Sequence, residues 1–482
     1  MKTRIVASLL LCGMLGARAA GLPDLGESSA SVVSPQQERE LGLEVMAEIR
    51  ADKSYWEDFE ITDYLQQLGY RLVAASSDTR QDFEFFLIRD ASVNAFALPG
   101  GFVGVHSGLI TTAQSESELA SVLGHEIAHV TQHHLARMIA GQSKNTITTM
   151  AALAIAILAA RSNAQAAEAA IAAAQAQSIQ SQLDFTRDNE READRFGLDT
   201  IVKAGFDPRA MPAFFERLQR ENRVYDSNAP QYLRTHPLTT ERIADVANRV
   251  EKLPYKQVSS SLDFSLVRVK IAAMQMRPQE GVREYESALH EGRVPELAQR
   301  YGLALSQMRA GRGKEATAEL DKIRAAGASS AILEGLSAQI KSAQGDKAGA
   351  AEIYAAALKR YPQSRALVYG NIEALIEMSQ PDRALRFIDD RMLLSTGDYR
   401  LYELRARCYA ATGKRLLEHQ SLAEAYVRRG NVSAAIDQLQ IALRSGDGDF
   451  YQTSSAEARL RELREQQRND KKSQQRGGQR SF

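Results

Sequence analysis

The sequence contains the run His125-Glu126-Ile127-Ala128-His129, which carries two histidines and a carboxylate at a spacing suited to metal chemistry. On a helix, residues four apart lie one turn apart on one face, so both imidazoles can reach a single ion with Glu126 beside them. A catalytic zinc site uses three protein ligands and keeps one position for a water, whose pKa the ion lowers to about 7. Glu126 would accept the proton of that water and pass it to the leaving amine. The competing interpretation is a helix that carries these residues by chance.

The chain around this run has the features of a buried helix over residues 115–134. Ser115 and Glu118 form the pattern of a capping box, which satisfies backbone N–H groups at the start of a helix. Apolar residues recur at helical spacing and predict a face packed into a core, at Leu119, Val122, Leu123, Ile127 and Val130. Beyond them, His133 and His134 are expected to face solvent or the flank of the helix.

A third metal ligand is predicted in the charged segment 189–199, which reads NEREADRFGLD. Glu190 and Asp194 lie one helical turn apart in it. A carboxylate from a second helix can complete a set of three ligands, and another carboxylate can orient a ligating imidazole from behind. Glu192 is a rival ligand, and a solvated helix face is the plain alternative for these acids.

Three stretches of the chain together resemble one family of enzymes. They are the HExxH run, the later Glu-x-x-Ala-Asp stretch, and the still later His236-Pro237 with Arg242. In these motifs the chain is similar to gluzincin metallopeptidases of the HtpX and CAAX-prenyl-protease type. The resemblance implies a catalytic centre with one Zn²⁺ per chain, whose ligands are His125, His129 and Glu190.

The same resemblance implies roles for the acids around the ion. Glu126 matches the general base, and Asp194 matches an acid that either supports a ligand from behind or donates a proton. Glu190 is preferred to Glu192 as the ligand because the ligand of the family lies four residues before its Asp.

The resemblance also implies that the His236-Pro237 segment lies near the metal. His236 could then contact the zinc water or stabilise the developing oxyanion, with Arg242 as a neighbouring positive charge. It could instead occupy the open zinc position of a resting enzyme, which would make its loop an autoinhibitory gate. A loop histidine with neither role is the remaining interpretation.

A short β-hairpin is predicted just before the HExxH helix. Residues 83–88 form an apolar and aromatic strand, and residues 93–98 and 102–105 flank the turn Pro99-Gly100-Gly101. An exposed strand edge beside a zinc helix can bind an extended peptide through main-chain hydrogen bonds. The family resemblance assigns this role to the stretch that includes Asn94, Ala95 and Phe96, and the alternative is an ordinary core hairpin. His106 is expected to be a structural histidine.

Composition and the first residues indicate an exported protein. The chain has 60 basic and 60 acidic residues, which argues against a nucleic-acid partner. Residues 1–19 have early cations, an apolar run and small residues at Ala17 and Ala19, the pattern of a cleaved signal peptide. After cleavage Cys408 is the one remaining cysteine, so no intramolecular disulfide can form. The expected compartment is the periplasm.

Residues 147–160 are apolar but number only 14, whereas a bilayer span needs about 20. In membrane-bound members of the family, this interval holds transmembrane segments, so the chain departs from them here. Residues 147–182 are expected to form a buried helical hairpin, with peripheral contact to a membrane surface as the alternative.

The second half of the chain carries internal repeats. Small residues followed by Ala recur with a period of 34 residues from Gly311, Gly345 and Ser379, which indicates tetratricopeptide helix pairs. The predicted domains are a zinc metallopeptidase domain over 20–253, a repeat array with a capping helix over 264–467, and a disordered tail over 468–482.

The predicted fold class is mainly α, with a zincin-like domain that holds a small β-sheet, followed by an α-solenoid of repeats. The resemblance implies a periplasmic quality-control endopeptidase that degrades outer-membrane β-barrel proteins stalled in assembly and assists their assembly. It also implies that the repeats dock on the outer-membrane assembly machinery. The competing hypothesis is a repeat-based chaperone or adaptor with a gated or non-catalytic zinc domain.

Overall fold

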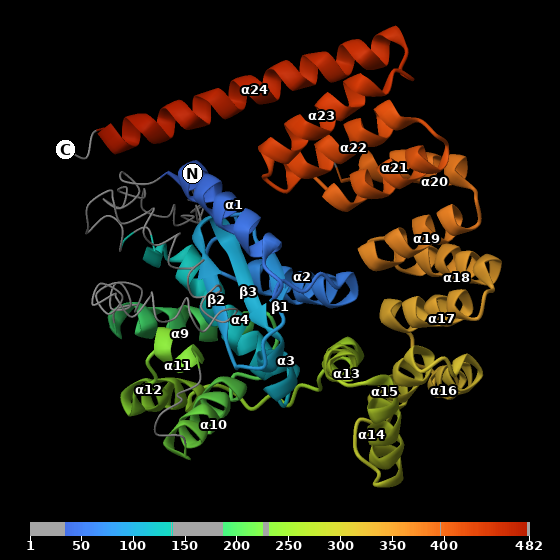
Figure 1. Ribbon diagram of the computed structural model, residues 1–482. Coiled ribbons are helices and arrows are strands. Elements are labelled where there is room, and N and C mark those ends of the chain that lie inside the picture. Colours follow the sequence, from blue (N-terminus) through green and yellow to red (C-terminus); the bar gives the residue numbers. More distant parts are fainter. Residues whose placement is uncertain (1–33, 136, 138–186, 225–230, 396, 480–482) are drawn as a thin grey trace, which may run out of the picture.

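The computed structural model describes residues 34–135, 137, 187–224, 231–395 and 397–479. The predicted signal peptide and the apolar interval 147–182 lie outside these residues. The predicted fold class is confirmed, since helices and one small sheet make up a first domain and helical repeats follow it (Figure 1). Among the described residues, no helix combines the length and the apolar character that a bilayer span requires.

The sheet has three strands in the order β1-β3-β2. Strand β1 (Glu84–Ile88) runs parallel to β3 (Phe102–His106), and β2 (Ala95–Leu98) runs antiparallel to β3. The tight turn η1 (Pro99–Gly101) joins β2 to β3, and both its glycines have positive φ, 74° and 83°, which a side chain would disfavour. The predicted hairpin is therefore present, and β2 forms one edge of the sheet.

Helices surround this sheet. The N-terminal pair is α1 (Pro35–Ala51) and α2 (Phe59–Val73), and the short α3 (Ser107–Thr112) leads into α4 (Glu116–Thr131). Ser115 caps α4, because its hydroxyl accepts the Glu118 N–H at 3.2 Å. The other half of the expected capping box differs, since the Glu118 carboxylate accepts the N–H of Gln114 at 2.7 Å and binds Arg217. Helix α4 packs against β2 and α2, and its residues 119–129 are fully buried.

The domain is completed by α9 (Arg187–Lys203), α10 (Ala210–Val224), α11 (Gln231–Thr235) and α12 (Thr240–Glu251). Helix α9 crosses α4 closely at two glycines. A Cβ atom on Gly197 would lie 3.0 Å from the His125 backbone nitrogen, and one on Gly124 would lie 3.2 Å from the Gly197 carbonyl oxygen. The two backbones therefore lie so close that a Cβ atom at either glycine would be crowded, and this close crossing brings the acids of α9 to the histidines of α4.

The repeats form an arc of helix pairs beside the first domain (Figure 1). The helices are α13 (Leu262–Gln275), α14 (Pro278–His290), α15 (Glu296–Arg309), α16 (Gly313–Ala325), α17 (Ala331–Ala343), α18 (Lys347–Arg360), α19 (Arg365–Glu377), α20 (Pro381–Met392), α21 (Tyr399–Ala411), α22 (Arg415–Arg428), α23 (Val432–Ser445) and α24 (Phe450–Gln479). Helix α22 packs against both α21 and α23.

The acidic start of α2 joins the two parts of the chain. The ammonium group of Lys270, on α13, lies 2.7 Å from Asp58 and 2.6 Å from Glu60. Arg365, at the start of α19, binds Asp63 at 2.7 Å. Since Lys270 is only 8% exposed, removal of either partner would leave a buried charge, so these ion pairs fix where the repeats pack.

The predicted disordered tail is wrong over most of its length. Helix α24 continues from Phe450 to Gln479, whereas the sequence predicted a capping helix that ended at Gln467. The physical reason is composition, because Arg, Lys, Glu and Gln are good helix formers and dominate residues 459–476. The other domain boundaries stay predictions.

We expect Gly197→Ala to destabilise the first domain by about 1 to 3 kcal/mol, the usual effect of overpacking, because the new methyl group meets the α4 backbone. Chemical denaturation followed by circular dichroism measures this. Gly397→Ala is the control, since a Cβ atom there meets nothing within 4 Å. Equal stability of Gly197→Ala and wild type would show that the helices do not need this close crossing.

Candidate metal centre

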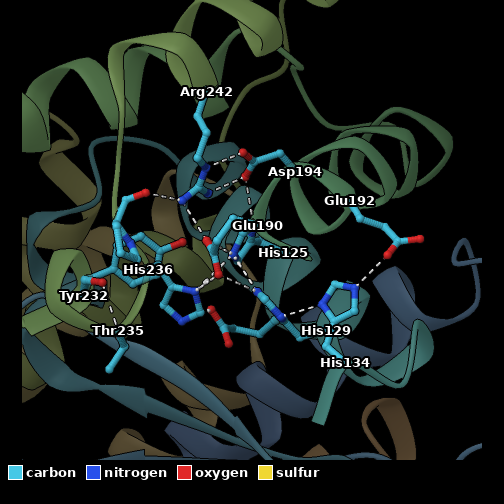
Figure 2. Close-up of polar contacts among 12 residues, drawn as sticks. His125, His129, His134, Glu190, Glu192, Asp194, Tyr232, Thr235, His236 and Arg242 are labelled. Carbon is cyan, nitrogen blue, oxygen red and sulfur yellow. Dashed lines mark hydrogen bonds and ion pairs between the residues drawn. The ribbon is translucent and has the colours of Figure 1, made fainter. Parts of the chain in front are cut away.

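Helices α4 and α9 bring three donor atoms to one point. The Nε2 atoms of His125 and His129 lie 3.0 Å apart. His125 Nε2 is 3.4 Å from Glu190 Oε2, and His129 Nε2 is 3.4 Å from the other oxygen, Oε1 (Figure 2). Zinc holds nitrogen and oxygen ligands at about 2.0 to 2.2 Å, which places the corners of a tetrahedron about 3.3 to 3.6 Å apart. The three side chains are at most 2% exposed. The observed spacings of 3.0 and 3.4 Å are close to these values, so the three side chains can hold one ion.

His236 supplies a fourth donor atom. It follows α11, and its Nδ1 lies 3.0 Å from Glu190 Oε1 and 3.3 Å from His125 Nε2. The donor atoms of His125, His129, Glu190 and His236 all lie within 4.8 Å of one another, and we call these four residues the donor cluster. His236 thus lies where the open position of a three-ligand zinc site would be.

The charges around the donor cluster favour a bound cation. Three carboxylates, those of Glu126, Glu190 and Asp194, are at most 2% exposed, and among the described residues one guanidinium, that of Arg242, is buried with them. Although burial opposes ionisation, His236, His125 and His129 hold the pKa of Glu190 well below its usual value. With neutral imidazoles the site carries a surplus of two negative charges, which a divalent ion would balance.

The pKa values of the two predicted imidazole ligands shift in opposite directions. Burial opposes a charge on His125, but the carboxylates of Asp194 and Glu190 outweigh it and raise the pKa of His125 to about 10. Burial lowers the pKa of His129 well below its usual value. Without an ion, a proton on His125 therefore supplies the positive charge that the carboxylates require.

Glu126 has the environment of a general base. It is fully buried, and both carboxylate oxygens are without a hydrogen-bond partner among the described residues. Burial raises the pKa of Glu126, while His236 and His125 act in the opposite direction. Its Oε1 lies 3.5 Å from His236 Nε2. A buried carboxylate is costly without hydrogen-bond partners, so a polar group that donates to Glu126 would stabilise its charged form.

Asp194 and Arg242 lie behind the donor cluster. Asp194 Oδ1 is 2.9 Å from His125 Nδ1, on the side of the ring away from the other donor atoms. Arg242 binds both oxygens of Asp194, at 2.7 and 2.8 Å, and Glu190 Oε2 at 2.7 Å. Because Asp194 faces the back of His125, this arrangement favours the supporting role over proton donation. The charge of Arg242 is directed at the carboxylates.

The expected positions of two other residues differ from the structure. The prediction that His134 faces solvent or the helix flank is wrong, because His134 is fully buried against His129. Glu192, the rival ligand, binds His134 and Arg137 and is not part of the donor cluster. Of the two acids, Glu190 is the one that contacts His125 and His129. His106 lies outside the cluster, where Ser92 contacts its Nδ1 at 3.0 Å.

The direction of the backbone N–H and C=O groups along β2 decides which of its residues can bind a peptide. The His106 N–H donates to the Asn94 carbonyl at 3.0 Å, so Asn94, Phe96 and Leu98 direct their backbone groups toward β3. Ala95 and Ala97 alternate with them and direct their N–H and C=O groups to the outer edge. Of the three predicted substrate-binding residues, Ala95 therefore directs its backbone N–H and C=O groups outward, where a peptide could bind. The backbone groups of Asn94 and Phe96 face β3 and belong to the hydrogen bonding of the sheet.

Tyr232 is a residue at this site that the sequence analysis did not identify. Its ring stacks on His236 with 4.9 Å between centroids, its N–H donates to the Val93 carbonyl at 3.2 Å, and its hydroxyl has no hydrogen-bond partner among the described residues. Tyr232 lies at the edge of a polar loop whose sequence has no periodic pattern. The one signal for its role was its proximity in sequence to His236-Pro237.

Comparison with known proteins identifies the family of the chain. Residues 61–250 match peptidase family M48, and residues 342–408 match the tetratricopeptide repeat. The chain is 33% identical to the beta-barrel assembly-enhancing protease of Escherichia coli K12 over 97% of both chains. It belongs to the beta-barrel assembly-enhancing protease family. The predicted resemblance to that protease, BepA, is confirmed.

Further relatives agree with this assignment. A Vibrio cholerae protein named for the same activity is 46% identical over 52% of each chain. The mitochondrial metalloendopeptidase OMA1 of Schizosaccharomyces pombe is 34% identical over 41% of this chain and 54% of its own. As a member of the beta-barrel assembly-enhancing protease family with an M48 domain, the protein is a metalloendopeptidase.

We expect zinc to raise the melting temperature of metal-free protein, because an ion that binds the folded state stabilises it, by about 2.7 kcal/mol at 100 times Kd. Glu190→Ala should abolish most of this increase by removing one donor atom. Asp188→Ala is the control, since this carboxylate lies on the same helix with its side chain 92% exposed. The ligand assignment would be wrong if both variants responded to zinc as wild type does.

Proposed function

We propose that this chain is a zinc-dependent endopeptidase of periplasmic quality control that cleaves outer-membrane β-barrel proteins stalled in assembly. The buried Glu126, which lies beside the donor cluster with its Oε1 3.5 Å from His236 Nε2, carries this proposal, because a structural metal site has no use for a base there. The proposed substrate class is supported by the name beta-barrel assembly-enhancing protease, which relatives that match nearly the whole chain carry.

The donor set fits zinc. Two imidazoles and one carboxylate are the ligands of several catalytic zinc sites, and the close spacing and the negative surplus suit a divalent ion. When bound, zinc would polarise the peptide carbonyl and increase the acidity of a water. His125, His129 and Glu190 would hold it, with Asp194 and Arg242 fixing the orientation of His125 and Glu190.

The side chains of this protein would then perform the proton transfers. Glu126 would accept a proton from the attacking water and deliver it to the amine nitrogen as the peptide bond breaks. The outward backbone groups of Ala95 and Ala97 would hold the substrate as an added strand, which keeps its scissile bond above Glu126. Burial excludes bulk water from this step.

We infer that His236 is a gate. Its Nδ1 lies among the donor atoms, where the open position of the zinc site would be, and its loop is tied down at two points. Arg242 donates to the Pro237 carbonyl at 2.8 Å, and the Tyr232 N–H donates to Val93. A substrate would therefore have to displace His236. If the centre is closed at rest, the repeats could bind a β-barrel protein and assist its assembly without cleaving it.

We further propose that the repeats dock on the outer-membrane assembly machinery in the periplasm. The first domain covers part of the inner side of the arc, because Lys270 and Arg365 of the repeats bind the acidic residues at the start of α2. The pair Phe450 and Tyr451, at 79% and 82% exposed, begins α24 away from these contacts, and supports a partner there.

Glu126→Gln tests the proposed function. We expect purified Glu126→Gln protein to cleave casein or a misassembled β-barrel protein about 10² to 10⁴ times more slowly, the usual loss for a general base. Bound zinc, measured by elemental analysis, should remain at one ion per chain because this substitution leaves all three proposed ligands in place. Unchanged degradation by Glu126→Gln would refute the protease hypothesis and favour the chaperone or adaptor.

His236→Ala separates the two roles of the loop histidine. If His236 is a gate, its removal should raise basal peptide hydrolysis several-fold at unchanged zinc content, since the fourth position becomes free. If it stabilises the oxyanion, the rate should instead fall by about 10² to 10³. Initial rates on a fluorogenic peptide distinguish these results, with Glu126→Gln as the inactive reference.

A further inference from the structure

A break in the helical conformation just after α4 places a second histidine ring beside the proposed metal ligand His129. Helix α4 ends at Thr131, and His133 has a left-handed backbone with φ of 53°. A positive φ is uncommon outside glycine and often marks a functional constraint. On a continued helix His134 would lie about 140° around the axis from His129, pointing elsewhere. The left-handed turn is therefore what brings the ring of His134 to the ring of His129.

The ring of His134 connects His129 to the outside of the domain. His134 Nδ1 lies 2.8 Å from His129 Nδ1, and His134 Nε2 lies 3.1 Å from Glu192 Oε2 (Figure 2). Arg137 donates to the same Glu192 oxygen at 2.5 Å. His134 is fully buried, and the side chain of Glu192 is 28% exposed. Three side chains thus form a line from His129 to the protein surface.

The protonation pattern of this line follows from its geometry. His129 directs Nε2 to the donor cluster, so with a metal ion bound that nitrogen offers its lone pair and Nδ1 carries the proton. The Nδ1–H of His129 must donate to His134 Nδ1, which therefore accepts. The proton of neutral His134 is then on Nε2, where it donates to Glu192.

We propose that His134, held by Glu192 and Arg137, is a positioning residue that fixes the tautomer and the ring orientation of the metal ligand His129. This rests on the proposed zinc centre. His125 receives the corresponding support from Asp194, at 2.9 Å. The two ligands differ in their support. The buried carboxylate of Asp194 contacts His125 directly, whereas the neutral imidazole of His134 lies between His129 and the partly exposed carboxylate of Glu192.

Zinc affinity of the full chain, measured by competition with a chelator, tests this proposal. His134→Phe removes the acceptor and should weaken zinc binding about 10- to 100-fold, the usual effect of losing such a partner. His134→Gln should restore most of the affinity, because its amide oxygen can accept from His129 and its NH₂ group can donate to Glu192. His133→Asn is the matched control, since Asn tolerates the left-handed turn and should leave the affinity unchanged.

Cobalt substitution gives a second readout. The visible spectrum of Co²⁺ reports ligand geometry, and it should change in His134→Phe and return toward wild type in His134→Gln. If wild type binds zinc and His134→Phe binds it equally tightly with an unaltered cobalt spectrum, the positioning role is wrong while the zinc centre stands. If wild type binds no zinc, the proposed function itself fails.

Glu192→Ala keeps the test decisive if His134→Phe does not fold. Glu192 is partly exposed, so its removal leaves the core intact, while His134 loses the carboxylate that orients it. A several-fold weaker zinc affinity would support the proposal. An affinity equal to that of wild type would overturn it.

Discussion

The site depends on the close crossing of α4 and α9. Two glycines let these backbones approach to within contact distance, and this approach places the buried carboxylates of Glu190 and Asp194 on either side of His125. Buried charges are costly unless they are paired, so the same packing requires the charge of Arg242 and either a bound cation or a proton on His125. The fold and the chemistry of the centre thus rest on one constraint.

Much of the fold was predictable because its signals are local. Ser115 caps α4 where the sequence indicates, and the turn Pro99-Gly100-Gly101 joins the predicted strands. The 34-residue period fixes the repeats. The HExxH spacing brings His125 and His129 together by helical geometry alone, whereas the proximity of Glu190 was inferred from family resemblance and required a contact between two distant helices.

What the sequence could not predict depends on backbone conformation and long-range packing. A helical period through residue 134 sends His134 outward, and a single left-handed residue reverses this. The direction of the backbone groups along β2 depends on its pairing with β3, so the choice between Ala95 and its neighbours needed coordinates. Arg242 is the positive charge that the resemblance places near the metal, but only the fold shows that two carboxylates and a carbonyl occupy it.

Under the proposed mechanism, the gate and the substrate compete for two contacts at once. His236 Nδ1 lies among the donor atoms, and the N–H of Tyr232 binds the Val93 carbonyl, which continues the outward phase of Ala95 and Ala97. A peptide that adds to the edge of β2 would reach the carbonyl that anchors the loop as its own scissile carbonyl approaches the position of His236. Arg242 also holds this loop through the Pro237 carbonyl. A peptide that displaces only His236 or only the Tyr232–Val93 hydrogen bond would therefore leave the loop in its closed position. Cleavage would therefore favour extended segments long enough to displace both contacts, a property that unfolded chains have and folded barrels lack.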